Sequence, residues 1–130
     1  MKILIYKRKV NFYETDAQGI VHHSNYPRYF EEARGFYLEE IGYPYHLVRN
    51  ELNIDIVLTE LNVIYKKPLN FGDNFEIHFG ISEINKYLFT FKYFVKKGSI
   101  LCSEGTTKHC CIDRTSKKIK PVPKEILKDI

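Results

Sequence analysis

The chain has no tryptophan and only three cysteines among its 130 residues. The cysteines, Cys102, Cys110 and Cys111, are odd in number and two are adjacent, so they predict neither a disulfide framework nor a CxxC metal motif. Because unpaired thiols are typical of a reducing compartment, we expect a cytoplasmic protein. No apolar run approaches the roughly 18 residues of a membrane-spanning helix, and the basic start shows no secretory signal. We therefore expect no transmembrane segment.

A strong excess of one charge is also missing, because 20 Lys and Arg residues against 16 Asp and Glu residues leave a formal net charge of +4. The basic residues are scattered, with small clusters at 7–9, 66–67 and 117–124. A nucleic-acid-binding surface would be denser and would belong to a recognisable module, so we expect no nucleic-acid partner. A few lysines could instead contact ligand phosphates, and no pattern in the sequence singles one cluster out.

Aromatic and apolar residues are abundant, since the chain has 10 Tyr and 9 Phe and is 44% hydrophobic. Such a composition is typical of a soluble, globular protein rich in strands. A length of 130 residues corresponds to a single domain over 1–130.

Hydrophobic periodicity predicts one long helix followed by a run of strands. Alternation predicts strands over residues 3–13, 54–66, 74–84, 86–97 and 100–112. Apolar residues three and four apart predict a helix over 24–41, capped by Ser24 or Asn25 and ended by Gly42. A short second helix over 45–52 is weakly indicated. Consecutive strands with tight turns favour an antiparallel sheet, so the expected fold class is α+β with two layers.

The sheet needs more cover than one helix provides. Residues 86–97 place an aromatic stripe on one face of their strand, formed by Tyr87, Phe89, Phe91 and Tyr93. Because one helix covers only one face, we expect a second copy of the chain to cover this stripe and the sheet edges. The sequence therefore predicts a homodimer or a larger homo-oligomer.

The segment between the first strand and the helix carries the chemistry. Asp16 lies in a loop with the permissive Gly19, seven residues before His23 at the expected helix start. A helix N-terminus presents unpaired N–H groups and a partial positive charge, which suit a developing oxyanion. An ionised carboxylate is a weak base, and a thiolate leaves more easily than an amine or an alkoxide. The pattern therefore favours thioester hydrolysis over amide hydrolysis.

This segment resembles a known signature. The matching residues are Tyr13, Asp16, Gly19, Val21, His23, Asn25 and Tyr26, followed by Phe30-Glu31-Glu32-Ala33-Arg34. They resemble the hotdog-fold acyl-CoA thioesterases, namely the 4-hydroxybenzoyl-CoA thioesterase family and its bacterial Tol-Pal-associated branch. Segments 65–73 and 111–123 are similar to the strand crossing and the closing strand of that family. The resemblance spans nearly the whole chain.

The resemblance implies a hotdog fold, in which a five-stranded antiparallel sheet wraps around one long helix, and homodimers or homotetramers with a continuous sheet. It implies that Asp16 is the catalytic nucleophile or general base, and that the backbone N–H of His23 polarises the carbonyl of an acyl-CoA or acyl carrier protein thioester. In the Tol-Pal-associated branch the side chain of the matching His also belongs to the active site. That branch has Tyr where this chain has Phe12. We further expect Gly19, Val21 and Tyr26 to contact the substrate, and we expect no cofactor.

Several alternatives stay open at this stage. Asp16 could serve only in an Asx-turn, His23 could contribute only its backbone, and Tyr26 at helical spacing is first of all a core residue. His22 and His23 are adjacent and expected to point in different directions, so we expect no metal site. The whole chain could be a non-catalytic acyl-thioester or lipid-binding module. It could also hydrate or dehydrate a thioester-bound acyl chain.

Overall fold

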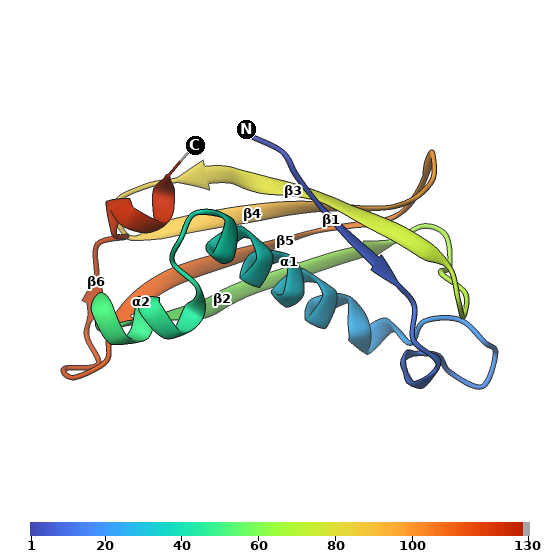
Figure 1. Cartoon of the computed structure of the whole chain (residues 1–130), viewed down its shortest axis with the longest axis horizontal. Helices are drawn as coiled ribbons and strands as arrows, with labels where there is room; N and C mark the ends of the chain where they lie inside the picture. Colours follow the sequence, from blue (N-terminus) through green and yellow to red (C-terminus); the bar gives the residue numbers. More distant parts are fainter. Residues whose placement is uncertain (129–130) are drawn as a thin grey trace.

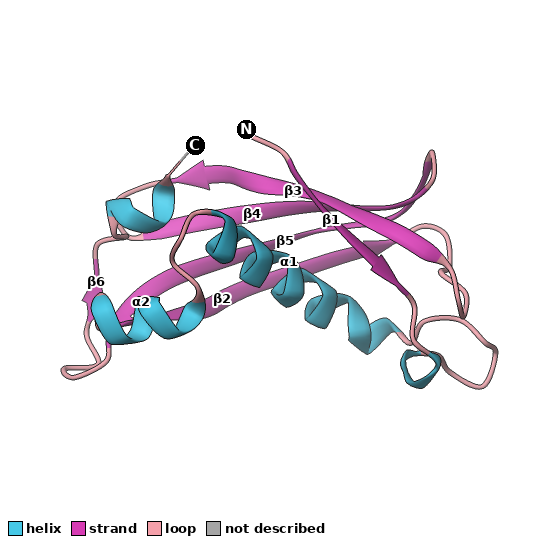
Figure 2. Cartoon of the chain, viewed as in Figure 1, coloured by secondary structure: helices cyan, strands magenta, loops and turns pink. Residues whose placement is uncertain are grey.

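The structure, a computed structural model, describes residues 1–128 and consists of an antiparallel sheet curved around a long helix (Figures 1 and 2). Its elements in chain order are β1 (Leu4–Lys9), η1 (Phe12–Glu14), η2 (His23–Asn25), α1 (Tyr26–Glu40), α2 (Tyr45–Glu51), β2 (Ile54–Tyr65), β3 (Asn74–Ile84), β4 (Leu88–Lys97), β5 (Ile100–Asp113), β6 (Ile119–Lys120) and η3 (Lys124–Leu127). The order of strands in the sheet is β1-β3-β4-β5-β2, with β6 pairing the end of β5.

The predicted α+β class is confirmed, and the expectation of five strands is wrong by one. All strand pairs are antiparallel, and the four longest strands lie within two residues of their predicted bounds. The additional strand, β6, has only two residues, Ile119 and Lys120. Two residues are too few to show an alternating pattern, so periodicity could not reveal it.

The first strand is shorter than predicted. It ends at Lys9, and residues 12–14 form the 3₁₀ turn η1. The turn forms because the carboxylate of Glu14 accepts a hydrogen bond from the backbone N–H of Asn11 at 2.8 Å. The chain therefore leaves the sheet before the segment that carries Asp16.

The long helix is found where it is predicted, but neither proposed residue caps it. It begins with the 3₁₀ turn η2 at His23, and its α-helical part starts at Tyr26. Asn25 makes no side-chain cap; its amide donates instead to the backbone carbonyl of Glu14 at 2.8 Å. The imidazole of His22 caps η2 by accepting from the N–H of Ser24 at 3.1 Å. None of the helices in residues 1–128 has the length and apolar character needed to cross a membrane.

The core lies between α1 and the sheet. The ring of Phe30 on α1 stacks on Tyr93 of β4, with centroids 4.1 Å apart and planes within 9°. Gly105 of β5 lies beneath this stack, where an added Cβ would stand 2.7 Å from the Phe30 ring and 2.6 Å from a backbone oxygen. Only glycine fits there, because real Cβ atoms do not approach other atoms so closely. Helix and sheet are therefore in direct contact at this point.

Of the two reasons given above for a second copy, the aromatic stripe and the sheet edges, the first is wrong. The stripe residues Phe89, Phe91 and Tyr93 face α1 and are at most 3% exposed, while Tyr87 is 44% exposed. Helix α1 therefore covers the buried part of the stripe within the same chain, together with α2 and η3, since Tyr45 and Ile126 line the same small cavity as Phe89 and Phe91.

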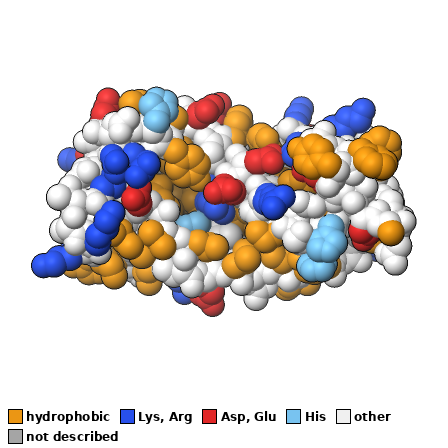
Figure 3. Space-filling view, turned by 90° about the horizontal axis from the view of Figure 1, so that it is seen from below, with side chains coloured by type: hydrophobic (Ala, Val, Ile, Leu, Met, Phe, Trp, Pro, Cys, Tyr) orange, Lys and Arg blue, Asp and Glu red, His pale blue; other side chains and the backbone are white. Residues whose placement is uncertain are grey.

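The longer open edge of the sheet is formed by β2. Among residues 1–128, β2 pairs only with β5, so its other edge has no strand beside it. Leu58, Leu61 and Ile64 on β2 are all more than 40% exposed. Seen from below, hydrophobic side chains form patches between charged ones on one face of the molecule (Figure 3). Within residues 1–128, β1 at the other end of the sheet also pairs with one strand only, but β2 is twice as long, so it is the larger of the two open edges.

Candidate active site

A cleft of about 340 Å³ opens where the loop after β1, the start of the helix and the end of β2 meet. Its lining residues come from these three segments and are Asp16, Ile20, Val21, His23, Tyr26, Tyr65, Lys66, Lys67 and Pro68. The cleft thus brings Asp16 and His23 together with Val21 and Tyr26, four of the residues singled out from the sequence. Gly19 is not among the lining residues.

A tight turn presents Asp16 to the cleft. The backbone N–H of Asp16 donates to the carbonyl of Ile20 at 2.8 Å, and that of Gly19 donates back to the carbonyl of Asp16 at 3.0 Å. Gly19 has φ +81°, a left-handed conformation that glycine adopts without strain. Gly19 therefore shapes the turn rather than the wall of the cleft.

The Asp16 carboxylate also makes the Asx-turn considered above. Its Oδ1 accepts from the backbone N–H of Gln18 at 2.8 Å. Within residues 1–128 no donor contacts the other carboxylate oxygen, and the residue is partly exposed at the cleft. The turn and a role in the cleft are compatible, because each uses a different oxygen.

A buried ionic network holds this loop against the helix. Glu14 is 4% exposed, and its carboxylate accepts two hydrogen bonds from Arg8, at 2.6 and 2.7 Å, and one from the hydroxyl of Tyr29 at 3.0 Å. Arg8 also donates from Nε to Glu32 on α1 at 2.6 Å. The backbone carbonyl of Glu14 accepts from the His22 N–H at 2.9 Å. The network therefore fixes both ends of the segment that carries Asp16.

The hydrogen bonds and burial of Glu14 and Tyr29 determine whether each side chain is ionised. Burial alone would raise the pKa of Glu14, but the hydrogen bonds from Arg8, Asn11 and Tyr29 outweigh burial and lower the pKa below its usual value. Burial and the nearby Glu14 carboxylate raise the pKa of Tyr29. Glu14 therefore stays ionised inside the protein. Sequence reasoning missed Arg8 and Glu14, because a carboxylate two residues before Asp16 gives no sign that it is buried.

The two histidines at the helix start lie together rather than apart. The rings of His22 and His23 have centroids 4.0 Å apart and planes inclined by 32°, so the expectation that they point in different directions is wrong. His22 Nδ1 is 2.8 Å from Ser24 Oγ. In the described part of the chain, no group of three or more His, Cys, Asp or Glu residues could hold a metal ion.

The backbone of His23 is fixed on one side and open on the other. Its carbonyl accepts a hydrogen bond from the hydroxyl of Tyr65 at 2.9 Å. Its N–H has no acceptor within residues 1–128. An N–H without a partner, at the first turn of a helical segment and beside a carboxylate, is a suitable donor to an oxyanion.

Aromatic rings form the inner wall of the cleft. Tyr26 is 3% exposed, and burial raises its pKa to about 12, so it stays neutral. The ring of Tyr65 meets the ring of Tyr26 edge-on, with centroids 5.1 Å apart. Sequence reasoning missed Tyr65 as a cleft residue, because its contacts to His23 and Tyr26 join segments about forty residues apart.

Comparisons with known proteins agree on one group. A family model described as "Thioesterase-like superfamily" matches residues 10–130. A crystal structure of a hypothetical protein from Aquifex aeolicus has a TM-score of 0.90 and 49% identity, covering 95% of this chain and 96% of its own. The acyl-CoA thioesterase YbgC of Haemophilus influenzae is 28% identical over 91% of this chain and 87% of its own length. A DHNA-CoA thioesterase structure from Staphylococcus aureus has a TM-score of 0.84 and 27% identity, covering 94% of this chain and 80% of its own.

Proposed function

The chain belongs to the thioesterase-like superfamily, and from this premise we propose that it is an acyl-CoA thioesterase with the hotdog fold, a single domain over residues 1–130. One observation carries the proposal: Asp16 and His23 line the same cleft, at the helix start, where the backbone N–H of His23 has no acceptor within residues 1–128. Two of the similar proteins, an acyl-CoA thioesterase and a DHNA-CoA thioesterase, support the same reaction class by their names.

In the proposed mechanism, Asp16 acts as a general base on water. The carboxylate oxygen that Gln18 does not contact takes a proton from water, whose oxygen attacks the thioester carbonyl carbon. The carbonyl oxygen becomes an oxyanion and accepts from the His23 N–H. The tetrahedral intermediate then collapses, the C–S bond breaks, and the leaving thiolate takes the proton held by Asp16 and departs as free coenzyme A. The product is a carboxylic acid.

A covalent route uses the same two residues. Asp16 would attack the carbonyl carbon itself, expel the thiolate and form a mixed anhydride, which water then hydrolyses. Hydrolysis in ¹⁸O-labelled water under single-turnover conditions separates the routes. The covalent route places label in Asp16 when water attacks the aspartyl carbonyl, and the general-base route places it only in the product.

Within the superfamily, we propose that the chain belongs with the 4-hydroxybenzoyl-CoA thioesterase family, because four of the signature residues, Asp16, Val21, His23 and Tyr26, line the cleft. The Tol-Pal-associated branch has a tyrosine hydroxyl where this chain has Phe12. The ring of Phe12 is 74% exposed and packs edge-on against Phe71, with centroids 5.4 Å apart. We therefore assign Phe12 no role in the reaction. We propose that the substrate is an acyl-CoA, without naming the acyl group, and that the enzyme is cytoplasmic.

Free thiol release from short-chain, long-chain and aromatic acyl-CoAs tests the proposed activity. We expect turnover above the spontaneous rate for at least one of these thioesters, without added metal or cofactor. Product mass spectrometry should show the free acid and coenzyme A. Saturable binding without hydrolysis across the whole panel would contradict the proposal, and so would loss or gain of water in the acyl chain.

We also propose that the protein assembles as a homodimer or a homotetramer through β2. An edge strand of 12 residues with exposed Leu58, Leu61 and Ile64 is unusual for a monomer, because such edges readily pair. Sedimentation at micromolar concentration should give at least twice the mass of the chain. We expect Leu61→Lys to lower that mass, whereas Ile119→Lys should not; Ile119 is an apolar residue on β6 that is even more exposed than Leu61, at 60% against 42%. A wild-type protein that sediments as a monomer would contradict this assembly.

A further inference from the structure

The rim of the cleft carries two lysines to which the proposed hydrolysis assigns no part. Lys66 and Lys67 follow directly after β2 and line the same cleft as Asp16 and His23. Both are exposed, whereas Val21 and Tyr26 deeper in the cleft are at most 5% exposed. The cleft is therefore apolar at its inner end and positively charged at its outer end.

The backbone of both lysines is held in place. The N–H groups of Lys66 and Lys67 both donate to the carbonyl of Cys102 on β5, each at 2.9 Å. The preceding residue, Tyr65, donates to the carbonyl of His23 at 2.9 Å. The lysine pair is therefore attached to the same rigid elements as the helix start, so its distance from Asp16 is set by the fold.

The ammonium groups themselves are not neutralised by a neighbour. Within residues 1–128, neither Lys66 nor Lys67 forms an ion pair, whereas Lys97 pairs with Asp73 at 3.1 Å and Lys108 with Glu60 at 3.2 Å. Two adjacent cations at the mouth of a cleft repel each other, and a bound anion relieves that repulsion. The pair therefore suits a ligand whose outer end is anionic.

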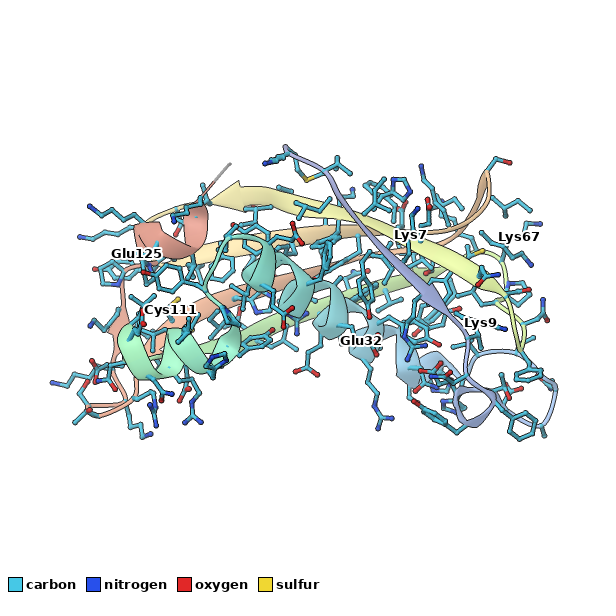
Figure 4. All side chains as sticks on the ribbon, viewed as in Figure 1. Lys7, Lys9, Glu32, Lys67, Cys111 and Glu125 are labelled. Carbon is cyan, nitrogen blue, oxygen red and sulfur yellow. The ribbon has the colours of Figure 1, made fainter. Side chains whose placement is uncertain are left out.

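Of the three basic clusters noted in the sequence, at 7–9, 66–67 and 117–124, only Lys66 and Lys67 line this cleft. The cluster at 117–124 lies around β6, at the opposite end of the molecule from the loop that carries Asp16 (Figure 1). Figure 4 shows Lys67 at one end, with Cys111 and Glu125 at the other. Lys120 in that distant cluster is also paired with Asp113 at 3.5 Å. Only the pair at 66–67 shares a cavity with the proposed catalytic carboxylate.

We propose that Lys66 and Lys67 bind the phosphate groups of a phosphorylated pantetheine carrier. This inference rests on the proposed thioester hydrolysis and names the carrier end of its substrate. In such a carrier, the pantetheine arm lies between the thioester and the nearest phosphate. In the cleft, the inner apolar end and the two lysines at the rim are likewise separate, so both ends of the carrier can be bound at once. Lys ammonium groups bind phosphate through charge-assisted hydrogen bonds. Coenzyme A and acyl carrier protein share this chemistry, so the experiment must distinguish them.

The test compares one acyl group on three carriers, namely coenzyme A, 4′-phosphopantetheine and pantetheine, which has no phosphate. We expect Lys66→Ala/Lys67→Ala to lower the ratio of kcat/KM for acyl-CoA to kcat/KM for acyl-pantetheine by about tenfold or more, mostly through KM. The double variant Lys118→Ala/Lys124→Ala removes two exposed lysines at the other end and should leave the ratio unchanged. A ratio that the Lys66→Ala/Lys67→Ala variant leaves unchanged would overturn the inference, whether or not overall activity falls.

Two further measurements keep the inference separate from the proposed function. Calorimetric titration with free coenzyme A should give a Kd about tenfold or more higher for the Lys66→Ala/Lys67→Ala variant than for the wild type, and equal Kd values would overturn the inference. If the wild type binds coenzyme A in this way but hydrolyses no thioester, the inference stands and the proposed hydrolysis fails. Assays on acyl carrier protein thioesters then identify the carrier, since the natural source should show the larger wild-type kcat/KM and the larger loss in the variant.

Discussion

Replacing Asp16 by Asn is expected to lower kcat on the best acyl-CoA substrate by about 100-fold or more. Asn has no negative charge, so it can neither take a proton from water nor attack a carbonyl efficiently. Its amide oxygen can still accept the hydrogen bond that Gln18 donates to Asp16, so the turn should persist. Steady-state thiol release and a thermal unfolding curve for the same preparation measure the two effects separately.

A matched control comes from a second aspartate with the same local structure. Asp113 accepts hydrogen bonds from the N–H groups of Thr115 and Ser116, at 2.9 and 2.8 Å, and lies at the other end of the molecule. Asp113→Asn should therefore leave kcat within about twofold of the wild type, because it changes an aspartate turn without touching the cleft. If Asp16→Asn kept wild-type turnover, Asp16 would be only a turn residue and the proposed mechanism would be wrong.

Replacing Arg8 by Met is expected to destabilise the fold by about 3–5 kcal/mol at pH 7, because it leaves a buried carboxylate without its cation. Glu14 is 4% exposed and would face Glu32 with no guanidinium between them. The comparison variant is Arg49→Met. Arg49 forms an ion pair of similar length, 2.8 Å, with Asp55, but both side chains are largely exposed, so we expect a loss below about 1 kcal/mol. Urea unfolding at pH 7 measures both.

The pH dependence of the same variant has a definite sign. In the wild type, the pKa of Glu14 is lower in the folded state than in the unfolded state, so its contribution to stability is present above about pH 4.3 and is lost as the pH falls through the folded pKa. Without Arg8, burial should raise the folded pKa, so the variant should gain stability as the pH falls. The gap between the two proteins should therefore narrow from pH 7 to pH 4. A gap of constant size would show that Arg8 acts by packing alone.

Much of the fold could be predicted because it depends on local periodicity. The helix over 26–40, the short helix after it and the four long strands all repeat apolar residues at the spacing that their geometry requires. The end of the helix just before Gly42 was predicted because glycine readily adopts the left-handed conformation that it has here, with φ +84°. Three features were not predicted correctly. The first strand ends early because the carboxylate of Glu14 accepts from the N–H of Asn11 in a 3₁₀ turn, Asn25 bonds the carbonyl of Glu14 and makes no side-chain cap, and β6 is too short to show a pattern.

The residues of the candidate site also fall into two groups, those that the sequence identified and those that it did not. Asp16 and His23 could be found because they are close together in the sequence and have a chemical meaning at a helix start. Tyr65, Lys66 and Lys67 could not be assigned to the site, because only the pairing of β2 with β5 and the contact to His23 bring them to the cleft. The role of Arg8 also escaped prediction, since an arginine on a short strand reads as a solvated surface residue.

Gly105 on β5 has no side chain, and this sets the distance between helix α1 and the sheet. Because the Phe30 ring rests directly on this bare stretch of backbone, the helix sits as low as its own side chains allow. His23 and Tyr26 belong to the same helical segment, so the width of the gap that admits a ligand depends on a residue that no ligand would touch. The width of the cleft is therefore set in part by β5, the strand next to the edge strand β2.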